Sequence, residues 1–187
     1  MNRNLRFKNL NDAVNELQRL DKGKVVTAKL WSYYQILNHC ADSLEFSMSS
    51  YPRVMPSFIR KTIGKFFFKK LMKDGYMKPG SPNPGAPKKR EEGDVVSALK
   101  RLRNSISIFT KYEGPFGIHP IFDELTKSEW EKLHTFHIAN HLGFADIDEN
   151  ENYSLKTTSP KKSAPKKKGK TIVKSKKKTT LKKKKGR

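Results

Sequence analysis

The sequence predicts an all-α protein, a four-helix bundle followed by a disordered, basic C-terminal tail. Four segments before residue 147 repeat apolar residues at intervals of three and four, and none alternates apolar with polar residues as a half-buried strand does. Beyond residue 147 lysines dominate and apolar residues are few, a composition that cannot bury enough surface to fold alone. We therefore expect a bundle domain over residues 1–147 and a linker with a Lys-rich tail over residues 148–187.

The first two expected helices cover residues 8–20 and about 32–48. The first helix carries apolar residues at helical spacing: Leu10, Ala13, Val14, Leu17 and Leu20. The second begins at a capping-box pattern, Ser32 followed three positions later by Gln35. Its apolar stripe comprises Ile36, Leu37, Cys40, Ala41 and Leu44. Both helices therefore have one face suited to a shared core.

The last two expected helices follow residues 91 and 126. The third has a nearly continuous apolar seam: Val95, Leu99, Leu102, Ile106 and Phe109. The fourth begins at a second capping-box pattern, formed by Thr126 and Glu129. Leu125 and Trp130 have the spacing of a hydrophobic staple around this cap. Together with the first two helices, these segments complete the expected bundle.

A further helical segment, "SFIRKTIGKFFFKKLMKDG" (57–75), places basic residues between apolar ones. Its apolar residues are Phe58, Ile59, Ile63, Phe66 and Phe67. Basic amphipathic helices can lie on a membrane surface. The alternative is a helix that packs on the domain and exposes its lysines, as is common in a basic protein. We expect the second arrangement, and a membrane is not among the expected partners.

The formal charge of +22 is unevenly distributed along the chain. Residues 156–187 contain sixteen of the 40 basic residues and no acidic residue, which leaves 24 basic and 18 acidic residues in residues 1–155. The body is therefore mildly basic, and the tail can bind phosphate backbones through counterion release. Lysines on a disordered chain carry no fixed donor geometry, so base specificity is not expected. A solubilising extension without a dedicated partner is the alternative.

The single cysteine, Cys40, excludes an internal disulfide and fits a reducing compartment. The first twenty residues lack the apolar run of a signal peptide, and no run of about 18 apolar residues occurs anywhere. We expect a cytoplasmic protein, with association with the nucleoid as an alternative suggested by the tail.

The stretch "EWEKLHTFHIANHLGF" holds three of the five histidines. His137 and His141 are four positions apart, so on a helix they lie about 40° and ~6 Å from each other, a spacing that binds zinc in metalloprotease helices. His134 precedes His137 by three positions on the same face but lies ~10 Å from His141, too far for all three to share one ion. The helix therefore offers either His134 with His137 or His137 with His141. A metal site would need a further ligand, for which His39 is a candidate. The alternative is that these histidines cap, pair with acids such as Asp42, or face solvent.

Two stretches, "WSYYQILNHCADS" (31–43) and "HPIFDELTKSEWEKLHTFHIANHLGF" (119–144), resemble the DinB/YfiT-like superfamily and one of its uncharacterised branches. The resemblance spans most of residues 8–145. It implies a bundle of up-down-down-up type that holds a divalent metal (Zn, Ni, Fe or Mn) through one side chain of the second helix and two of the last. The positions that match are His39, His137 and His141.

The resemblance also implies a reaction class, metal-dependent thiol transfer or hydrolysis with a low-molecular-weight thiol or another small substrate. A general base would be needed, and Asp42 and His134 are the candidates; for Asp42 a surface ion pair is the alternative. The sequence departs from the branch at Asn140, where many relatives have histidine, and at Asp123, where many have glycine. Pairing of two copies through helix faces is a further expectation.

The competing hypothesis is a non-enzymatic, nucleic-acid-associated protein in which the bundle is a scaffold and residues 156–187 bind DNA or RNA. The enzyme hypothesis predicts dependence on the three histidines and indifference to the tail. The binding hypothesis predicts the reverse.

Overall fold

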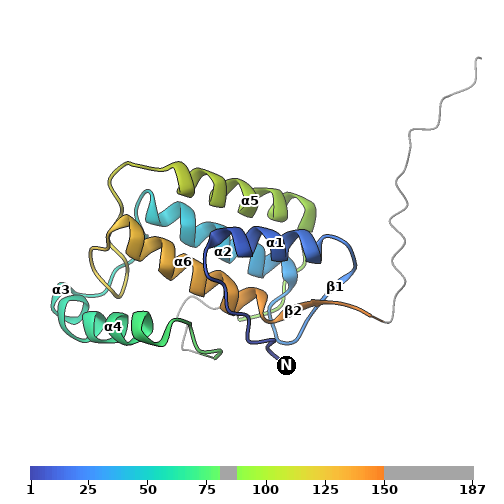
Figure 1. The fold of residues 1–187 in the computed structure, drawn as a ribbon, viewed down its shortest axis with the longest axis horizontal. Helices are drawn as coiled ribbons and strands as arrows, with labels where there is room; N and C mark the ends of the chain where they lie inside the picture. Colours follow the sequence, from blue (N-terminus) through green and yellow to red (C-terminus); the bar gives the residue numbers. More distant parts are fainter. Residues whose placement is uncertain (81–87, 150–187) are drawn as a thin grey trace, which may run out of the picture. The chain divides into compact units, whose positions relative to one another are not determined.

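The computed structural model describes residues 1–80 and 88–149, which are mainly helical (Figure 1). The elements in chain order are α1 Leu10–Leu20, β1 Val25–Thr27, α2 Tyr33–Ser47, α3 Ser57–Ile59, the π-helix η1 Arg60–Gly64, α4 Lys65–Asp74, α5 Val95–Lys111, α6 Lys127–Leu142 and β2 Ala145–Ile147. The predicted mostly helical character is confirmed. The predicted tail lies, from residue 150 onward, outside the described residues. No helix among the described residues is long and apolar enough to cross a membrane.

Both predicted capping boxes form, and they set where α2 and α6 begin. Ser32 Oγ accepts from the Gln35 amide at 3.1 Å, and Gln35 Oε1 accepts from the Ser32 amide at 3.0 Å. Thr126 and Glu129 make the same reciprocal pair at the start of α6. Such caps satisfy amides that have no partner within the helix. Because the helix starts are fixed, the faces on which later residues lie are fixed as well.

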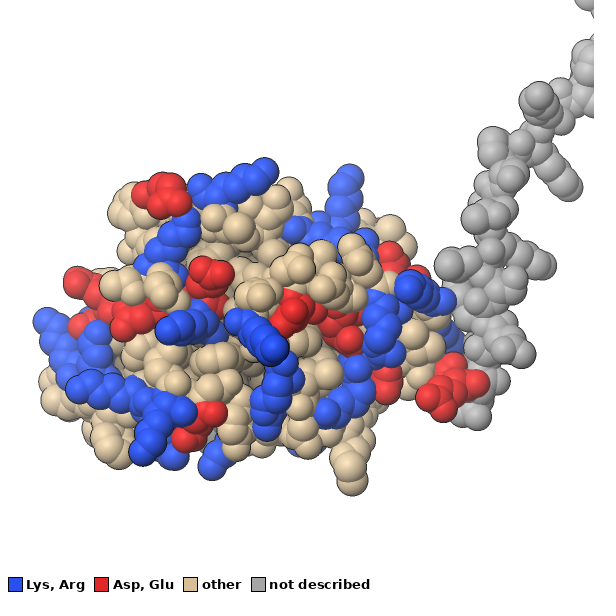
Figure 2. Space-filling model, in the orientation of Figure 1, with Lys and Arg blue, Asp and Glu red and all other residues tan. Residues whose placement is uncertain are grey.

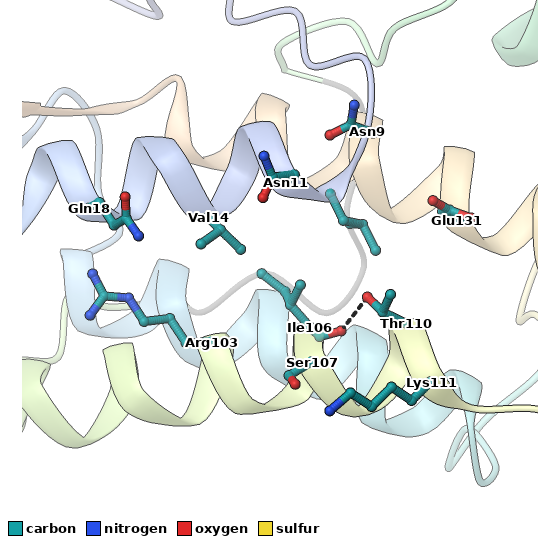
Figure 3. A pocket seen from close by; sticks show the side chains of 11 residues that line it. Asn9, Asn11, Val14, Gln18, Arg103, Ile106, Ser107, Thr110, Lys111 and Glu131 are labelled. Carbon is teal, nitrogen blue, oxygen red and sulfur yellow. Dashed lines mark hydrogen bonds between the residues drawn. The ribbon is translucent and has the colours of Figure 1, made fainter.

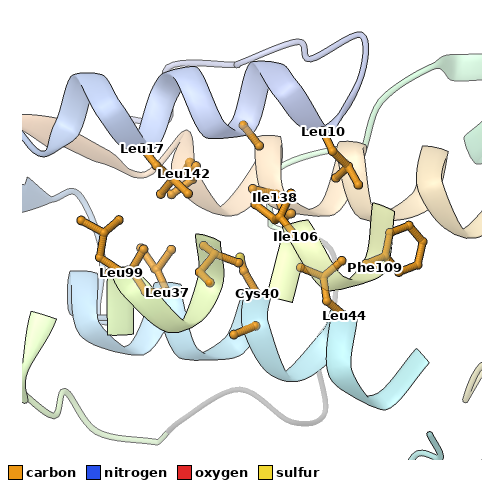
Figure 4. Packing of buried hydrophobic residues seen from close by; sticks show 14 of the residues in the cluster. Leu10, Leu17, Leu37, Cys40, Leu44, Leu99, Ile106, Phe109, Ile138 and Leu142 are labelled. Carbon is orange, nitrogen blue, oxygen red and sulfur yellow. The ribbon is translucent and has the colours of Figure 1, made fainter. Parts of the chain in front are cut away.

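One hydrophobic core joins α1, α2, α5 and α6. Helix α2 packs against α5 and α6, and α1 packs against α6 and α5. Figure 4 shows side chains from these helices meeting, among them Leu17, Leu37, Leu99 and Leu142. Cys40 is completely buried in this core, and burial raises the pKa of its thiol because the thiolate is poorly solvated there.

A short antiparallel sheet, absent from the predicted fold, joins the segments after α1 and α6. In it Val25 lies opposite Ile147 and Thr27 opposite Ala145. Each strand has three residues, too few to show an alternating pattern in the sequence. The sheet places the chain just after α6 beside the loop that leads into α2.

The segment from α3 to α4, residues 57–74, is called the arm. Its inner side is anchored to the loop that precedes α6. Arg60 forms a buried ion pair with Asp123 and donates from Nε to the Met55 carbonyl at 2.8 Å. At Gly64 the backbones approach so closely that a Cβ would clash with the carbonyl oxygen of Ile121. These contacts of the inner side prevent the arm from rotating about its own axis.

The outer side of the arm differs from the prediction. Four of its five predicted packing residues are more than half exposed, namely Phe58, Ile63, Phe66 and Phe67. Phe68, which was not among those five residues, is buried in the core cluster. The arm is amphipathic, as its sequence pattern predicts, but no other part of the described chain covers its apolar face.

Candidate metal centre

Three histidines from two helices converge between α2 and α6. His39 lies in the middle of α2, and His137 and His141 lie one turn apart in the second half of α6. His39 Nε2 is 3.0 Å from His137 Nε2, and the three ring centroids lie 4.6–4.9 Å from one another. One nitrogen of each ring lies within 4.8 Å of the others. The spacing of His137 and His141 and their meeting with His39 were both expected from the sequence and its resemblance.

The environment keeps the three rings neutral. Burial lowers the pKa of His39, lowers that of His137 well below its ordinary value, and lowers that of His141 to about 3. Burial is the largest cause in each case, and the proximity of the other rings adds to it for His137 and His141. A neutral imidazole has one nitrogen with a free lone pair, which is the form that binds a metal ion. The cluster is therefore competent as a ligand set near neutral pH.

Trp31 lies against the cluster, a contact that the sequence did not indicate. Its ring meets His39 edge to face at 4.9 Å and stacks on His141 at 5.1 Å. The Thr27 hydroxyl donates to the Trp31 carbonyl at 2.7 Å and holds the backbone there. Trp31 precedes the cap of α2, so helical periodicity does not relate it to either histidine. Trp31 and the three histidines all remain partly exposed, which leaves the cluster within reach of solvent.

Asp42, one of the two candidate general bases, faces α5. Its carboxylate accepts from Arg101 Nη2 at 2.6 Å, and the same guanidinium binds Glu45. The Asp42 side chain is 42% exposed. Its charge acts to raise the pKa of His39, but burial outweighs that effect. The alternative role, a surface ion pair, is therefore present, with an arginine as its partner.

His134, the other candidate base, lies in the core beside the cluster. It is 1% exposed and stacks on Trp130 at 5.2 Å. Its Nε2 is 3.0 Å from Ser47 Oγ, and this hydroxyl donates to the Leu44 carbonyl at 2.6 Å. Because the hydroxyl hydrogen is used there, His134 Nε2 is the donor and Nδ1 carries the lone pair. That Nδ1 is buried and has no hydrogen-bond partner among the described residues.

His119 has a structural place in the loop before α6. Its Nδ1 accepts from the amides of Ile121 and Phe122, each at 3.0 Å, and its ring stacks on Phe122 at 4.4 Å. Burial lowers the pKa of His119 to about 3. This histidine therefore shapes the turn and lies outside the three-histidine group.

A separate groove lies between α1 and α5 (Figure 3). It has a volume of about 640 Å³ and is lined by apolar residues such as Val14 and Ile106 and by polar ones such as Gln18, Arg103 and Lys111. None of the clustered histidines lines it. The groove is therefore independent of the candidate metal centre.

The fold and the cluster together define a mostly helical protein with a three-histidine group between two helices. The chain belongs to the family described as "Protein of unknown function (DUF1569)", which matches residues 1–147. The match ends at the last residue of β2, so the basic tail lies beyond it. No match was found among curated proteins or among solved structures.

Proposed function

We propose that the chain is a DinB-like metalloprotein that binds a divalent ion, Zn, Ni, Fe or Mn, through His39, His137 and His141. The observation that carries this proposal is the convergence of three neutral imidazoles from two helices. The up-down-down-up bundle of the superfamily is part of the same proposal, supported by the shared core of α1, α2, α5 and α6.

The donor set fits such an ion. Histidine nitrogens bind zinc at about 2.0–2.1 Å, so two ligands of one ion lie roughly 3 Å apart. His39 Nε2 and His137 Nε2 have that separation, 3.0 Å. Three protein ligands are the usual number in catalytic sites, in which a further position stays open. The partial exposure of the three rings is consistent with an open position that solvent can reach.

We propose metal-dependent thiol transfer or hydrolysis as the reaction, with a low-molecular-weight thiol or another small molecule as substrate. A divalent ion at this position would lower the pKa of a bound water or hold a thiol as thiolate. The protein would orient its ligands through the capped helices and shield one side with Trp31. Of the two candidate bases, His134 has an unprotonated Nδ1 without a partner, whereas the Asp42 carboxylate accepts from Arg101, an interaction that favours its charged form and weakens it as a base.

Metal content decides the proposal. Protein without a histidine tag is loaded with each of the four ions, desalted and analysed by plasma mass spectrometry. We expect near-stoichiometric metal in the wild type and none in the His137→Ala, His141→Ala double variant. The matched control is His134→Gln, which changes a histidine of the same helix while keeping a donor for Ser47, and it should retain the metal. Equal metal in wild type and double variant, or none in the wild type, would refute the proposal. Thiol-transfer and hydrolase screens then test the reaction class.

A second candidate function rests on residues 156–187, a segment with sixteen basic residues and no acidic residue. We propose that this tail binds nucleic acid without base specificity. The logarithm of the association constant should fall linearly with the logarithm of the salt concentration, by about 0.9 per neutralised phosphate of duplex DNA. Fluorescence anisotropy with duplexes of unrelated sequence measures this slope for the whole chain and for residues 1–155. Affinity that survives deletion of the tail, or that differs widely between sequences, would contradict it.

A further inference from the structure

The outer face of the arm exposes several large apolar side chains. We define it by four apolar residues, Phe58, Ile63, Phe66 and Phe67, which are 69%, 56%, 66% and 54% exposed. Isolated exposed apolar residues are common on proteins, but several large ones side by side mark an interaction site. The rings of Phe66 and Phe67 contact each other, with centroids 5.8 Å apart. The four residues therefore lie exposed along one continuous helical segment, α3 to α4.

Positive charge accompanies this patch. The arm contains six basic residues and one acidic residue, Asp74, which pairs with Lys70. Lys61, Lys69 and Lys73 are exposed along the arm. In Figure 2, Lys and Arg gather at the end of the body where Figure 1 shows α3 and α4. The partner of the outer face must therefore accept both bulky apolar side chains and cations.

The arm cannot hide the patch by rotating. Its inner side is fixed by the Arg60–Asp123 ion pair and by the close approach of Gly64 to Ile121. Phe68 adds a contact with Phe122 at 5.4 Å. Turning Phe66 and Phe67 inward would break the buried ion pair and expose Phe68. The structure thus holds the outer face toward solvent.

We propose that the outer face of the arm binds an anionic membrane surface. An amphipathic helix with aromatic residues on one face and lysines beside them lies in the plane of the lipid headgroups. The aromatic rings enter the boundary with the acyl chains, while the lysines contact anionic headgroups. A second copy of the chain fits less well, because two net-positive arms would repel each other.

Vesicle co-sedimentation of the full-length chain tests the proposal. The vesicles are phosphatidylcholine alone or phosphatidylcholine with phosphatidylglycerol. The test variant is Phe66→Ser, Phe67→Ser; the control is Val96→Ser, Ile108→Ser, which removes two exposed apolar residues from α5. All proteins keep the basic tail, so its electrostatic contribution is common to them. Measurement at about 150 mM and at higher salt reduces that contribution by screening.

We expect the wild type and the control to bind the anionic vesicles, and the partition coefficient of the test variant to fall by about tenfold or more. Circular dichroism should show the same helix content in all three proteins, since the replaced side chains are exposed. Equal binding of test variant and wild type would assign vesicle binding to the tail and overturn the proposal. Absence of wild-type binding would also overturn the proposal. So would a wild-type dimer that becomes a monomer in the Phe66→Ser, Phe67→Ser variant, because the patch would then be a protein interface.

Discussion

Replacing Asp123 by glycine sets two effects against each other. Asp123 has a φ of 69°, in the left-handed region where glycine is favoured, and glycine should relieve about 1 kcal/mol of strain. The same change removes the ion-pair partner of Arg60. The Arg60 side chain is 9% exposed and the Asp123 side chain 10% exposed. Loss of one partner of a buried pair costs about 3–5 kcal/mol. We therefore expect Asp123→Gly to lower the free energy of unfolding by roughly 2–4 kcal/mol.

Urea unfolding followed by circular dichroism and tryptophan fluorescence measures this change. The matched control is the double variant Arg60→Met, Asp123→Gly, which removes both charges and should lie within about 1 kcal/mol of the wild type. Arg60→Met alone leaves a buried carboxylate and should be destabilised like Asp123→Gly. If Asp123→Gly alone is as stable as the wild type, losing the partner of Arg60 costs no more than the about 1 kcal/mol of strain that glycine relieves, and the ion pair is not a main anchor of the arm.

Two further predictions concern buried titratable groups. The pKa of His119 is lowered from 6.5 to about 3, so the unfolded chain binds a proton that the folded chain excludes. Stability from this residue is present above about pH 6.5 and is lost as pH falls toward 3, by at most about 1.4 kcal/mol per pH unit. The other buried histidines add their own contributions, so His119→Asn should reduce the measured slope in urea titrations by no more than that amount. An unchanged slope would show that the pKa of His119 is not lowered. Burial raises the pKa of Cys40, so iodoacetamide at neutral pH should label it only after unfolding, and mass spectrometry of the native protein should show an unmodified thiol.

The positions of the helices could be predicted from the sequence more completely than the composition of the histidine cluster. Periodicity and the two capping boxes placed both ends of α2 and the start of α6 to within a residue or two, because both signals are local. The spacing of His137 and His141 identified a candidate pair for the same reason. It could not identify the helix that faces them, and His39 entered the ligand set through the resemblance. Local patterns describe a helix face but do not say what covers it.

The same limit explains what the sequence left out. The strands are too short to carry a pattern, and Trp31 reaches the histidines from outside any helix. The outer face of the arm has the same periodicity that a buried face would have, so its exposure could not be predicted. The presence of an aspartate with a left-handed backbone at position 123 could not be explained from the sequence either. Its ion-pair partner, Arg60, lies 63 positions earlier in the chain.

The antiparallel sheet has a consequence for how the protein is made. Arg19 at the end of α1 binds Asp146 in β2, 127 positions later, and the Arg3 amide donates to the Gly143 carbonyl at 2.8 Å. A ribosome adds about 5–20 residues per second, so the N-terminal helix waits for roughly 6–25 s before these partners have been synthesised. Contacts of such long sequence separation also slow folding, because a large loop must close before they form. The part of the apolar face of α1 that packs on α6 thus has no partner in the nascent chain until residues 127–142 have been synthesised.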